Sequence, residues 1–138
     1  MKIEINRVND AMHMEAVNDT GNVVSMDGSP DIGGVNAGAR PMQLLLMGLG
    51  GCSSIDVLSI LNKQKQQVDQ YNVVVTATKV DDIPSIFEEI HIQFNVSGEV
   101  TEDKLERAIN LSVEKYCSVV KILEQSAKIT TSYILNNK

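Results

Sequence analysis

The sequence predicts an α+β domain in which an antiparallel sheet is combined with two main helices. Three observations lead to this prediction. Short runs of alternating apolar and polar residues occur near both ends and in the middle of the chain, two longer runs have the composition of helices, and no strand–helix–strand repeat connects them. The 138 residues are enough for one domain, so we expect residues 1–138 to form a single one.

The first forty residues predict three strands and a loop. Residues 2–6 and 12–17 alternate between apolar and polar side chains, which is typical of strands. Asn-Asp-Thr-Gly at 18–21 has the chemistry of a turn and leads into a third strand at 22–26. Residues 27–39 contain four glycines and a proline, which predicts a surface loop.

A long apolar helix is predicted from Pro41 to about Lys63, because proline suits the first turn of a helix and a polar run follows. The uncharged run stops at Asp56, short of the roughly 20 residues that a bilayer requires, so we do not expect a membrane span. Apolar residues lie on every side of this helix. One sheet covers only one of its faces, so we expect an intimate homodimer.

The second half of the chain predicts two strands, a helix and a last strand. Residues 71–80 and 87–96 form the two strands, and the second alternates cleanly, as a half-buried antiparallel strand does. A helix is predicted from 102 to about 125, and a short strand at 128–135 closes the chain. The order of elements is therefore β-β-β-α-β-β-α-β.

Charge and composition exclude several classes of function. The net charge of −6 and the absence of a Lys/Arg cluster disfavour nucleic acid and anionic membranes as partners. The N-terminus alternates in charge and has no apolar signal core, so we expect a cytoplasmic protein. Two histidines and two cysteines stand far apart without metal-ligand spacing, and we expect neither a metal nor a cofactor.

The two cysteines are the candidate reactive residues. Cys52 follows two glycines in the first helix, and Cys117 lies in the second predicted helix. In a reducing compartment such a pair is seldom a structural disulfide, unless the bond is transient and catalytic. Two buried, unreactive thiols explain the same composition equally well, because cysteine is among the most buried residue types.

Residues 40–57, Arg-Pro-Met-Gln-Leu-Leu-Leu-Met-Gly-Leu-Gly-Gly-Cys-Ser-Ser-Ile-Asp-Val, and residues 115–119, Lys-Tyr-Cys-Ser-Val, resemble the OsmC/Ohr superfamily. The resemblance implies a homodimer in which sheets wrap around paired central helices. It also implies a thiol peroxidase that reduces organic hydroperoxides in defence against oxidative stress. Cys52 would be the peroxidatic residue and Cys117 the resolving one, and an external thiol would reduce the disulfide between them.

Cys52 needs a nearby cation or strong hydrogen-bond donors, since a free thiol of pKa about 8.5 is only about 3% ionised at neutral pH. Arg40 and Arg7 are the candidate cations. In the family's peroxidases a carboxylate about ten residues before the first cysteine holds such an arginine, but Met42 stands at that position here. Gln43 beside it could accept a hydrogen bond from an arginine.

Asp56 lies one helical turn after Cys52, on the same face. A carboxylate beside a thiol raises the pKa of that thiol, so Asp56 would position an arginine or a backbone amide and would not activate Cys52 directly. The alternative is a buried polar residue that satisfies a neighbouring loop.

Two other functions fit the same residues, so the sequence leaves open whether the protein is an enzyme. One is a non-catalytic protein that holds a small apolar ligand in a cavity between subunits. The other is a thiol–disulfide exchange protein without peroxidase activity.

Overall fold

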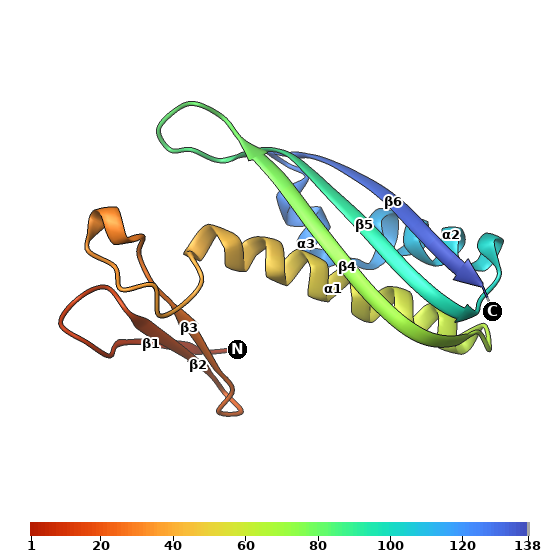
Figure 1. The fold of residues 1–138 in the computed structure, drawn as a ribbon, viewed down its shortest axis with the longest axis horizontal. Helices are drawn as coiled ribbons and strands as arrows, with labels where there is room; N and C mark the ends of the chain where they lie inside the picture. The colour runs from red at the N-terminus through yellow and green to blue at the C-terminus, as the bar shows by residue number, and fades with distance from the viewer. Residues whose placement is uncertain (138) are drawn as a thin grey trace. The chain divides into compact units, whose positions relative to one another are not determined.

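The computed structural model describes residues 1–137, which form two compact units, one ending at Leu45 and one beginning at Leu46 (Figure 1). Each unit has its own three-stranded sheet. The two-sheet, helix-containing architecture confirms the predicted α+β class. That residues 1–138 act as a single domain stays a prediction.

The first unit contains a meander of three antiparallel strands, as predicted. They are β1 (Ile3–Arg7), β2 (Met14–Asn18) and β3 (Val23–Met26), in the order β1-β2-β3. The turn between β2 and β3 forms because the Asn18 side chain accepts hydrogen bonds from the backbone amides of Thr20 and Asn22 at 3.0 and 2.9 Å. Such side-chain acceptance is the reason asparagine favours turns.

The loop after β3 is tied together by one buried carboxylate. Asp27 is 2% exposed and accepts hydrogen bonds from the backbone amides of Gly28, Val35 and Ala37 at 2.7, 3.1 and 3.0 Å. The Ala37 amide, with those of the other two residues, holds the pKa of Asp27 below its usual range. The predicted loop is therefore an ordered structure, which includes the single 3₁₀ turn η1 (Pro30–Ile32).

Helix α1 (Pro41–Lys63) has the predicted bounds. Pro41 occupies its first turn, where the missing amide hydrogen costs nothing. The Gln43 side chain reaches back and accepts a hydrogen bond of 2.9 Å from the backbone amide of Arg40, as in a capping box. At the other end Lys65 adopts a positive φ of 56°, which stops the helix.

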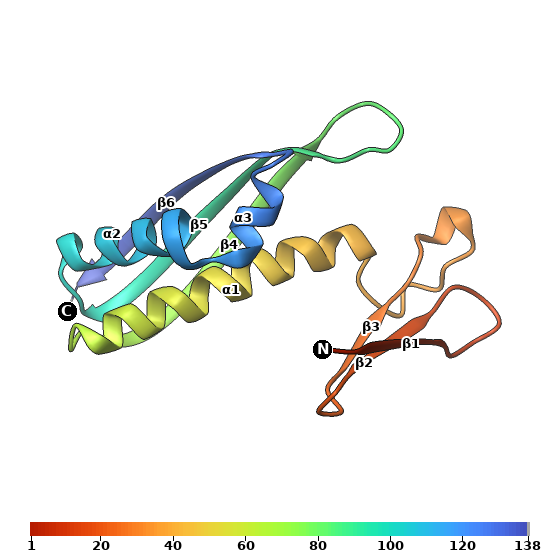
Figure 2. The ribbon, with the colours of Figure 1, turned by 180° about the vertical axis from the view of Figure 1, so that it is seen from behind.

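The second unit has one sheet with its helices on a single face (Figures 1 and 2). The strands are β4 (Gln67–Lys79), β5 (Phe87–Glu99) and β6 (Lys128–Asn137), in the order β4-β5-β6. Strand β5 is central and supplies much of the core, and the alternation predicted for it is confirmed. Its inward residues are at most 1% exposed: Ile90, Ile92, Phe94 and Val96.

One detail of the predicted sheet is wrong, because β6 pairs with β5 in parallel. Strands β4 and β5 are antiparallel, as expected. After β5 the chain crosses the face of the sheet in helices before it enters β6, so β6 runs in the same direction as β5 (Figure 2). The sheet is therefore mixed.

The second predicted helix is also wrong as a continuous element. It consists of α2 (Glu102–Leu111), one wide π-helical turn η2 (Ser112–Tyr116) and α3 (Ser118–Leu123). The amide of Cys117 bonds to the carbonyl of Ser112 at 2.7 Å, five residues back, and Cys117 itself is extended, with φ −72° and ψ 105°. Single π turns of this kind are frequent at functional sites.

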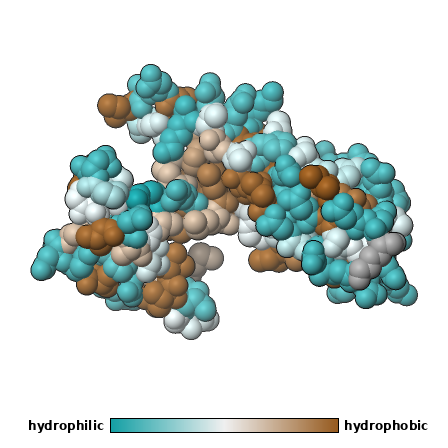
Figure 3. Space-filling view, in the orientation of Figure 1, coloured by the Kyte–Doolittle hydropathy of each residue, from teal (hydrophilic) through white to brown (hydrophobic). Residues whose placement is uncertain are grey.

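Helix α1 buries one stripe and exposes apolar residues elsewhere. Within the second unit Leu49, Val57 and Leu61 are fully buried, whereas Met47 and Ile55 are 56% and 71% exposed. By length and composition α1 could cross a membrane, and 22% of its 18-residue apolar window is buried within the chain. Apolar side chains, brown in Figure 3, thus reach the surface.

Candidate active site

The second unit brings Cys52 and Cys117 together from different elements. Cys52 lies in α1, and Cys117 lies at the junction of η2 and α3. Their Sγ atoms and a carboxylate oxygen of Asp56 all lie within 4.8 Å of one another. Both cysteines are free thiols. A disulfide requires an S–S distance near 2 Å, so the two sulfurs would have to approach each other by at most about 2.8 Å to form one.

The two thiols have different surroundings. Cys117 is 4% exposed and its sulfur accepts a long hydrogen bond of 3.5 Å from the amide of Val120. Burial, assisted by the adjoining Cys52 thiol, raises the pKa of Cys117 to about 11. Cys52 is only partly buried. At neutral pH Cys117 is therefore a protonated thiol, and Cys52 is the more accessible of the two.

Asp56 is held in place by the turn that precedes Cys117. The Ser112 hydroxyl donates to Asp56 Oδ2 at 3.1 Å, and the carbonyl oxygen of Ser53 lies 3.4 Å from the same hydroxyl. The ion pairs formed within residues 1–137 join Lys2 to Glu4 and Lys121 to Glu124, so none of them involves Asp56. The carboxylate is thus positioned by a serine and not by an arginine.

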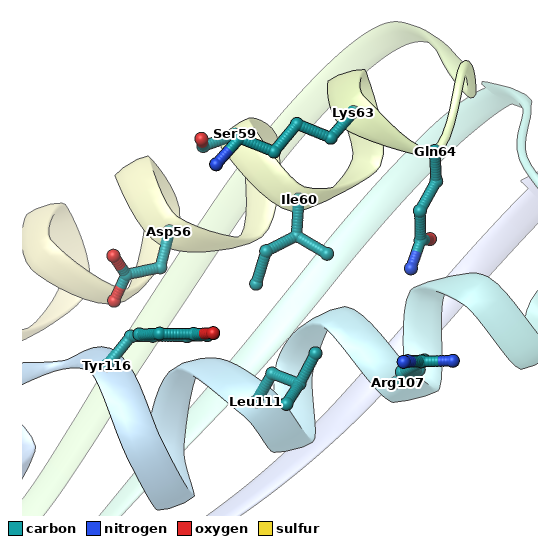
Figure 4. A pocket seen from close by; sticks show the side chains of 8 residues that line it. All are labelled: Asp56, Ser59, Ile60, Lys63, Gln64, Arg107, Leu111 and Tyr116. Atoms are coloured by element: carbon teal, nitrogen blue, oxygen red, sulfur yellow. The ribbon is translucent and has the colours of Figure 1, made fainter.

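A pocket of about 330 Å³ borders this cluster. Figure 4 shows Asp56 and Tyr116 at one end, Ile60 and Leu111 in the middle, and Gln64 and Arg107 toward the other end, while the Lys63 side chain runs back along α1 toward Ser59. The eight residues that line the pocket are Asp56, Ser59, Ile60, Lys63, Gln64, Arg107, Leu111 and Tyr116. The pocket combines a small apolar centre with charged ends, and neither sulfur lines it.

The other predicted site residues lie in the first unit and form local bonds there. The Arg40 guanidinium donates to Gly38 O at 3.1 Å and to Asn36 Oδ1 at 3.0 Å. Arg7 donates to the backbone oxygens of Ala11 and Asp10, the former at 2.8 Å. Gln43 does bond to Arg40, although to its backbone amide rather than to its guanidinium. Their roles toward Cys52 stay predictions.

Several residues of the site were missed by reasoning from the sequence. Among them are Ser112, which holds Asp56, and Arg107, Lys63 and Tyr116, which line the pocket. A serine and single basic residues in a helical pattern are typical of solvated surface. The sequence links Ser112 to the site only through its position, five residues before Cys117.

Comparison with known proteins identifies the family to which this chain belongs. The model of the OsmC-like protein family matches residues 33–132, a stretch that contains both cysteines and Asp56. The chain belongs to the OsmC-like protein family. The relationship suggested by residues 40–57 and 115–119 is thereby confirmed.

Individual OsmC-like relatives extend over most of the chain. Protein YhfA of Escherichia coli strain K12 is 40% identical over 115 residues, which cover 83% of each protein. A hypothetical protein from Aquifex aeolicus VF5, of known crystal structure, is 31% identical, with a TM-score of 0.86 and coverage of 99% of this chain and 96% of that one.

The organic hydroperoxide resistance protein OhrB of Bacillus subtilis is a more distant structural relative. Its TM-score is 0.67 at 15% identity, with 96% of each chain covered. At that identity the likeness shows a common fold alone.

Proposed function

We propose that this OsmC-like protein is a thiol peroxidase that reduces organic hydroperoxides. The observation that carries the proposal is the approach of the Cys52 and Cys117 sulfurs, which lie within 4.8 Å although 64 residues separate them in the chain. Hydroperoxide resistance in the names of OhrB and other structural relatives supports the same chemistry.

The reaction proceeds in three steps. The Cys52 thiolate attacks the terminal peroxide oxygen, the O–O bond breaks, and with one proton an alcohol and a Cys52 sulfenic acid form. The Cys117 thiol then attacks the sulfenic sulfur, and water leaves as the disulfide forms. An external thiol reductant returns both residues to thiols while two of its own sulfurs are oxidised to a disulfide.

The order of the two residues follows from their surroundings. The peroxidatic thiol must meet a hydroperoxide and ionise, and Cys52 is the less buried of the pair. Burial raises the pKa of Cys117 to about 11, so Cys117 is a poor nucleophile for a free hydroperoxide at neutral pH. The resolving step asks less of it, because the sulfenic sulfur is already next to it. Arg40 and Arg7 are the cations that we propose for stabilising the Cys52 thiolate.

We further propose a cytoplasmic homodimer in which a second copy covers the outer face of α1. The exposed Met47, Ile55 and Leu58 support this arrangement. A second copy suits this helix better than a membrane does, because Asp56 interrupts its apolar run and its other face packs in the core of its own unit.

The experiment is to treat the reduced protein with half an equivalent of cumene hydroperoxide and to map its disulfides by mass spectrometry. A Cys52–Cys117 bond is expected. Cys52→Ser should abolish peroxide consumption, and Cys117→Ser should accumulate a sulfenic acid that dimedone traps. Disulfide exchange without peroxide consumption would instead identify a thiol–disulfide exchange protein.

The pocket beside Asp56 favours a second candidate function, the binding of a small ligand without catalysis. Its charged ends suit a partly polar ligand better than the purely apolar one expected from the sequence. Native mass spectrometry of the purified protein tests this alternative, because a bound ligand would add a defined mass. Full peroxide turnover by protein that has lost this mass would exclude a purely ligand-binding role.

A further inference from the structure

The three atoms that meet at the thiol pair are also a set of metal ligands. A tetrahedral zinc site has Zn–S bonds near 2.3 Å and Zn–O bonds of about 2.0–2.2 Å, which corresponds to ligand–ligand separations of roughly 3.5–3.8 Å. The Cys52, Cys117 and Asp56 atoms lie within 4.8 Å of one another. Each pair therefore has to close by at most about 1.3 Å to reach this geometry.

The chemistry of the donors selects the type of ion. Two thiolates and one carboxylate suit a thiophilic, borderline-soft cation such as Zn²⁺. Ca²⁺ and Mg²⁺ require six or more oxygen ligands, and only one of the three donors here is oxygen. Three protein ligands also leave the fourth tetrahedral position open for water or another small ligand.

The surrounding structure orients these ligands before any ion arrives. Cys52 and Asp56 stand four residues apart on α1 and so face the same side. Ser112 donates to Asp56 Oδ2, as outer-shell partners of metal-binding carboxylates do. Asp56 also lines the 330 Å³ pocket, at the end where Figure 4 shows it beside Tyr116.

We propose that Cys52, Asp56 and Cys117 form a binding site for a single thiophilic divalent cation of the Zn²⁺ class. This proposal differs from the expectation drawn from the sequence, which was that the protein binds no metal. That expectation was based on the large separation of the cysteines and histidines along the chain. It does not depend on peroxidase activity, because it requires only the reduced thiols and the carboxylate.

Metal binding and disulfide formation exclude each other at this site. The ion requires both sulfurs as thiolates, and its binding releases their protons. A Cys52–Cys117 disulfide leaves neither sulfur as a thiolate ligand. A bound ion would in turn keep the sulfurs from a hydroperoxide, so that metal would inhibit the oxidation proposed above.

The test is to titrate the reduced protein with Zn²⁺ against a chromophoric chelator and to repeat the titration with Co²⁺. We expect one ion per chain and the near-ultraviolet charge-transfer absorption that cobalt–thiolate bonds produce. Cys52→Ser and Cys117→Ser should each abolish that absorption or weaken affinity by at least 100-fold. Asp56→Asn should weaken it at least tenfold and Ser112→Ala about tenfold.

Two controls make the outcome decisive. Ser126→Ala, which alters an exposed serine between α3 and β6 that does not line the pocket, should bind as the wild type does. Wild-type protein oxidised to the Cys52–Cys117 disulfide should bind no ion, a result that does not depend on how any variant folds. Unchanged binding by oxidised protein or by Cys52→Ser would overturn the proposal, as would the absence of binding at micromolar Zn²⁺.

Discussion

Ser112 donates its hydroxyl hydrogen to Asp56 Oδ2 over 3.1 Å, and this bond joins α1 to the turn η2, which directly precedes Cys117. Ser112 is fully buried, so its hydroxyl requires a partner within the protein. The bond fixes the carboxylate beside the two sulfurs and anchors the wide turn η2 at its first residue. The geometry of the candidate site therefore depends on a residue that does no chemistry itself.

Ser112→Ala should lower the free energy of unfolding by about 2 kcal/mol, because it removes a buried hydrogen bond to a carboxylate. Urea denaturation measures this change. The rate of Cys52–Cys117 disulfide formation should fall as well, since Asp56 and η2 lose their anchor. Ser59→Ala is the matched control and should change stability by less than about 0.5 kcal/mol. Equal stability of the two variants would contradict the anchoring role.

The stability of the protein should decline at alkaline pH because of Cys117. Its pKa rises on folding from the ordinary range of a thiol, about 8.5–9.0, to about 11, chiefly through burial. Between these values the unfolded chain loses the thiol proton and the folded protein keeps it. The contribution is therefore fully present below pH 9 and is lost as the pH rises toward 11.

Comparison of wild type with Cys117→Ala isolates the contribution of Cys117 to the free energy of unfolding. The tyrosines and lysines, which also lose protons at alkaline pH, are the same in both proteins. Urea unfolding at pH 8 and at pH 10.5 should show a larger alkaline loss in the wild type. Identical losses in the two proteins would mean that Cys117 does not titrate with a raised pKa.

Closure of the disulfide should accelerate with pH. The attacking Cys117 is a thiolate only in small proportion below its pKa of about 11. The rate of attack on the Cys52 sulfenic acid should rise about tenfold per pH unit between pH 7 and 9, in proportion to the thiolate fraction. Competition between closure and dimedone trapping measures this rate. A rate that is independent of pH would assign the resolving role to another thiol.

Much of the fold followed from local sequence. Pro41 and the polar run after Lys63 bound α1, and the alternation in β5 identified its buried face. The direction of β6 did not follow, because alternation is the same in parallel and antiparallel strands. That direction depends on how α2 and α3 cross the sheet, which is a tertiary property.

The candidate site was predictable only in part. The apolar pattern continues through residues 105–123 and predicts one continuous helix. In the structure the helix is interrupted at Cys117, and the turn before the interruption is bonded to Asp56 through Ser112. A contact with another element cannot be read from the local pattern. The thiol pair itself was anticipated. The residues that surround it, such as Tyr116 and Arg107, carry no local signal, since they meet α1 only when α2 packs beside it.

Arg107→Gln should raise the KM for a negatively charged hydroperoxide and leave the KM for an uncharged one nearly unchanged. Arg107 lines the pocket at the end away from Asp56 (Figure 4). A hydroperoxide whose peroxide group lies at the thiol pair beside Asp56, and whose carboxylate extends into the pocket, would meet the Arg107 guanidinium. In the variant the KM for such a substrate should be about tenfold higher, because one charged hydrogen bond to the substrate is lost.

Cumene hydroperoxide, which has no charge, provides the comparison, and its KM should change little. Lys128→Gln removes one positive charge from an exposed position in β6 and should affect neither substrate. Equal increases in KM for both hydroperoxides would show that Arg107 shapes the pocket and does not recognise an anion.

Gly51→Ala tests whether a second copy covers α1. Within the chain a methyl group at Gly51 meets no atom within 4 Å, and alanine favours helix by about 1 kcal/mol over glycine. An uncovered face would therefore make the variant more stable. If a second copy packs closely here, the methyl group is forced into that interface, and the homodimer should dissociate at concentrations at least tenfold higher than for wild type.

Sedimentation velocity over a dilution series measures this change, and Asn110→Ala, an exposed position on α2, is the control. A more stable Gly51→Ala protein with unchanged association would place the partner's contact elsewhere.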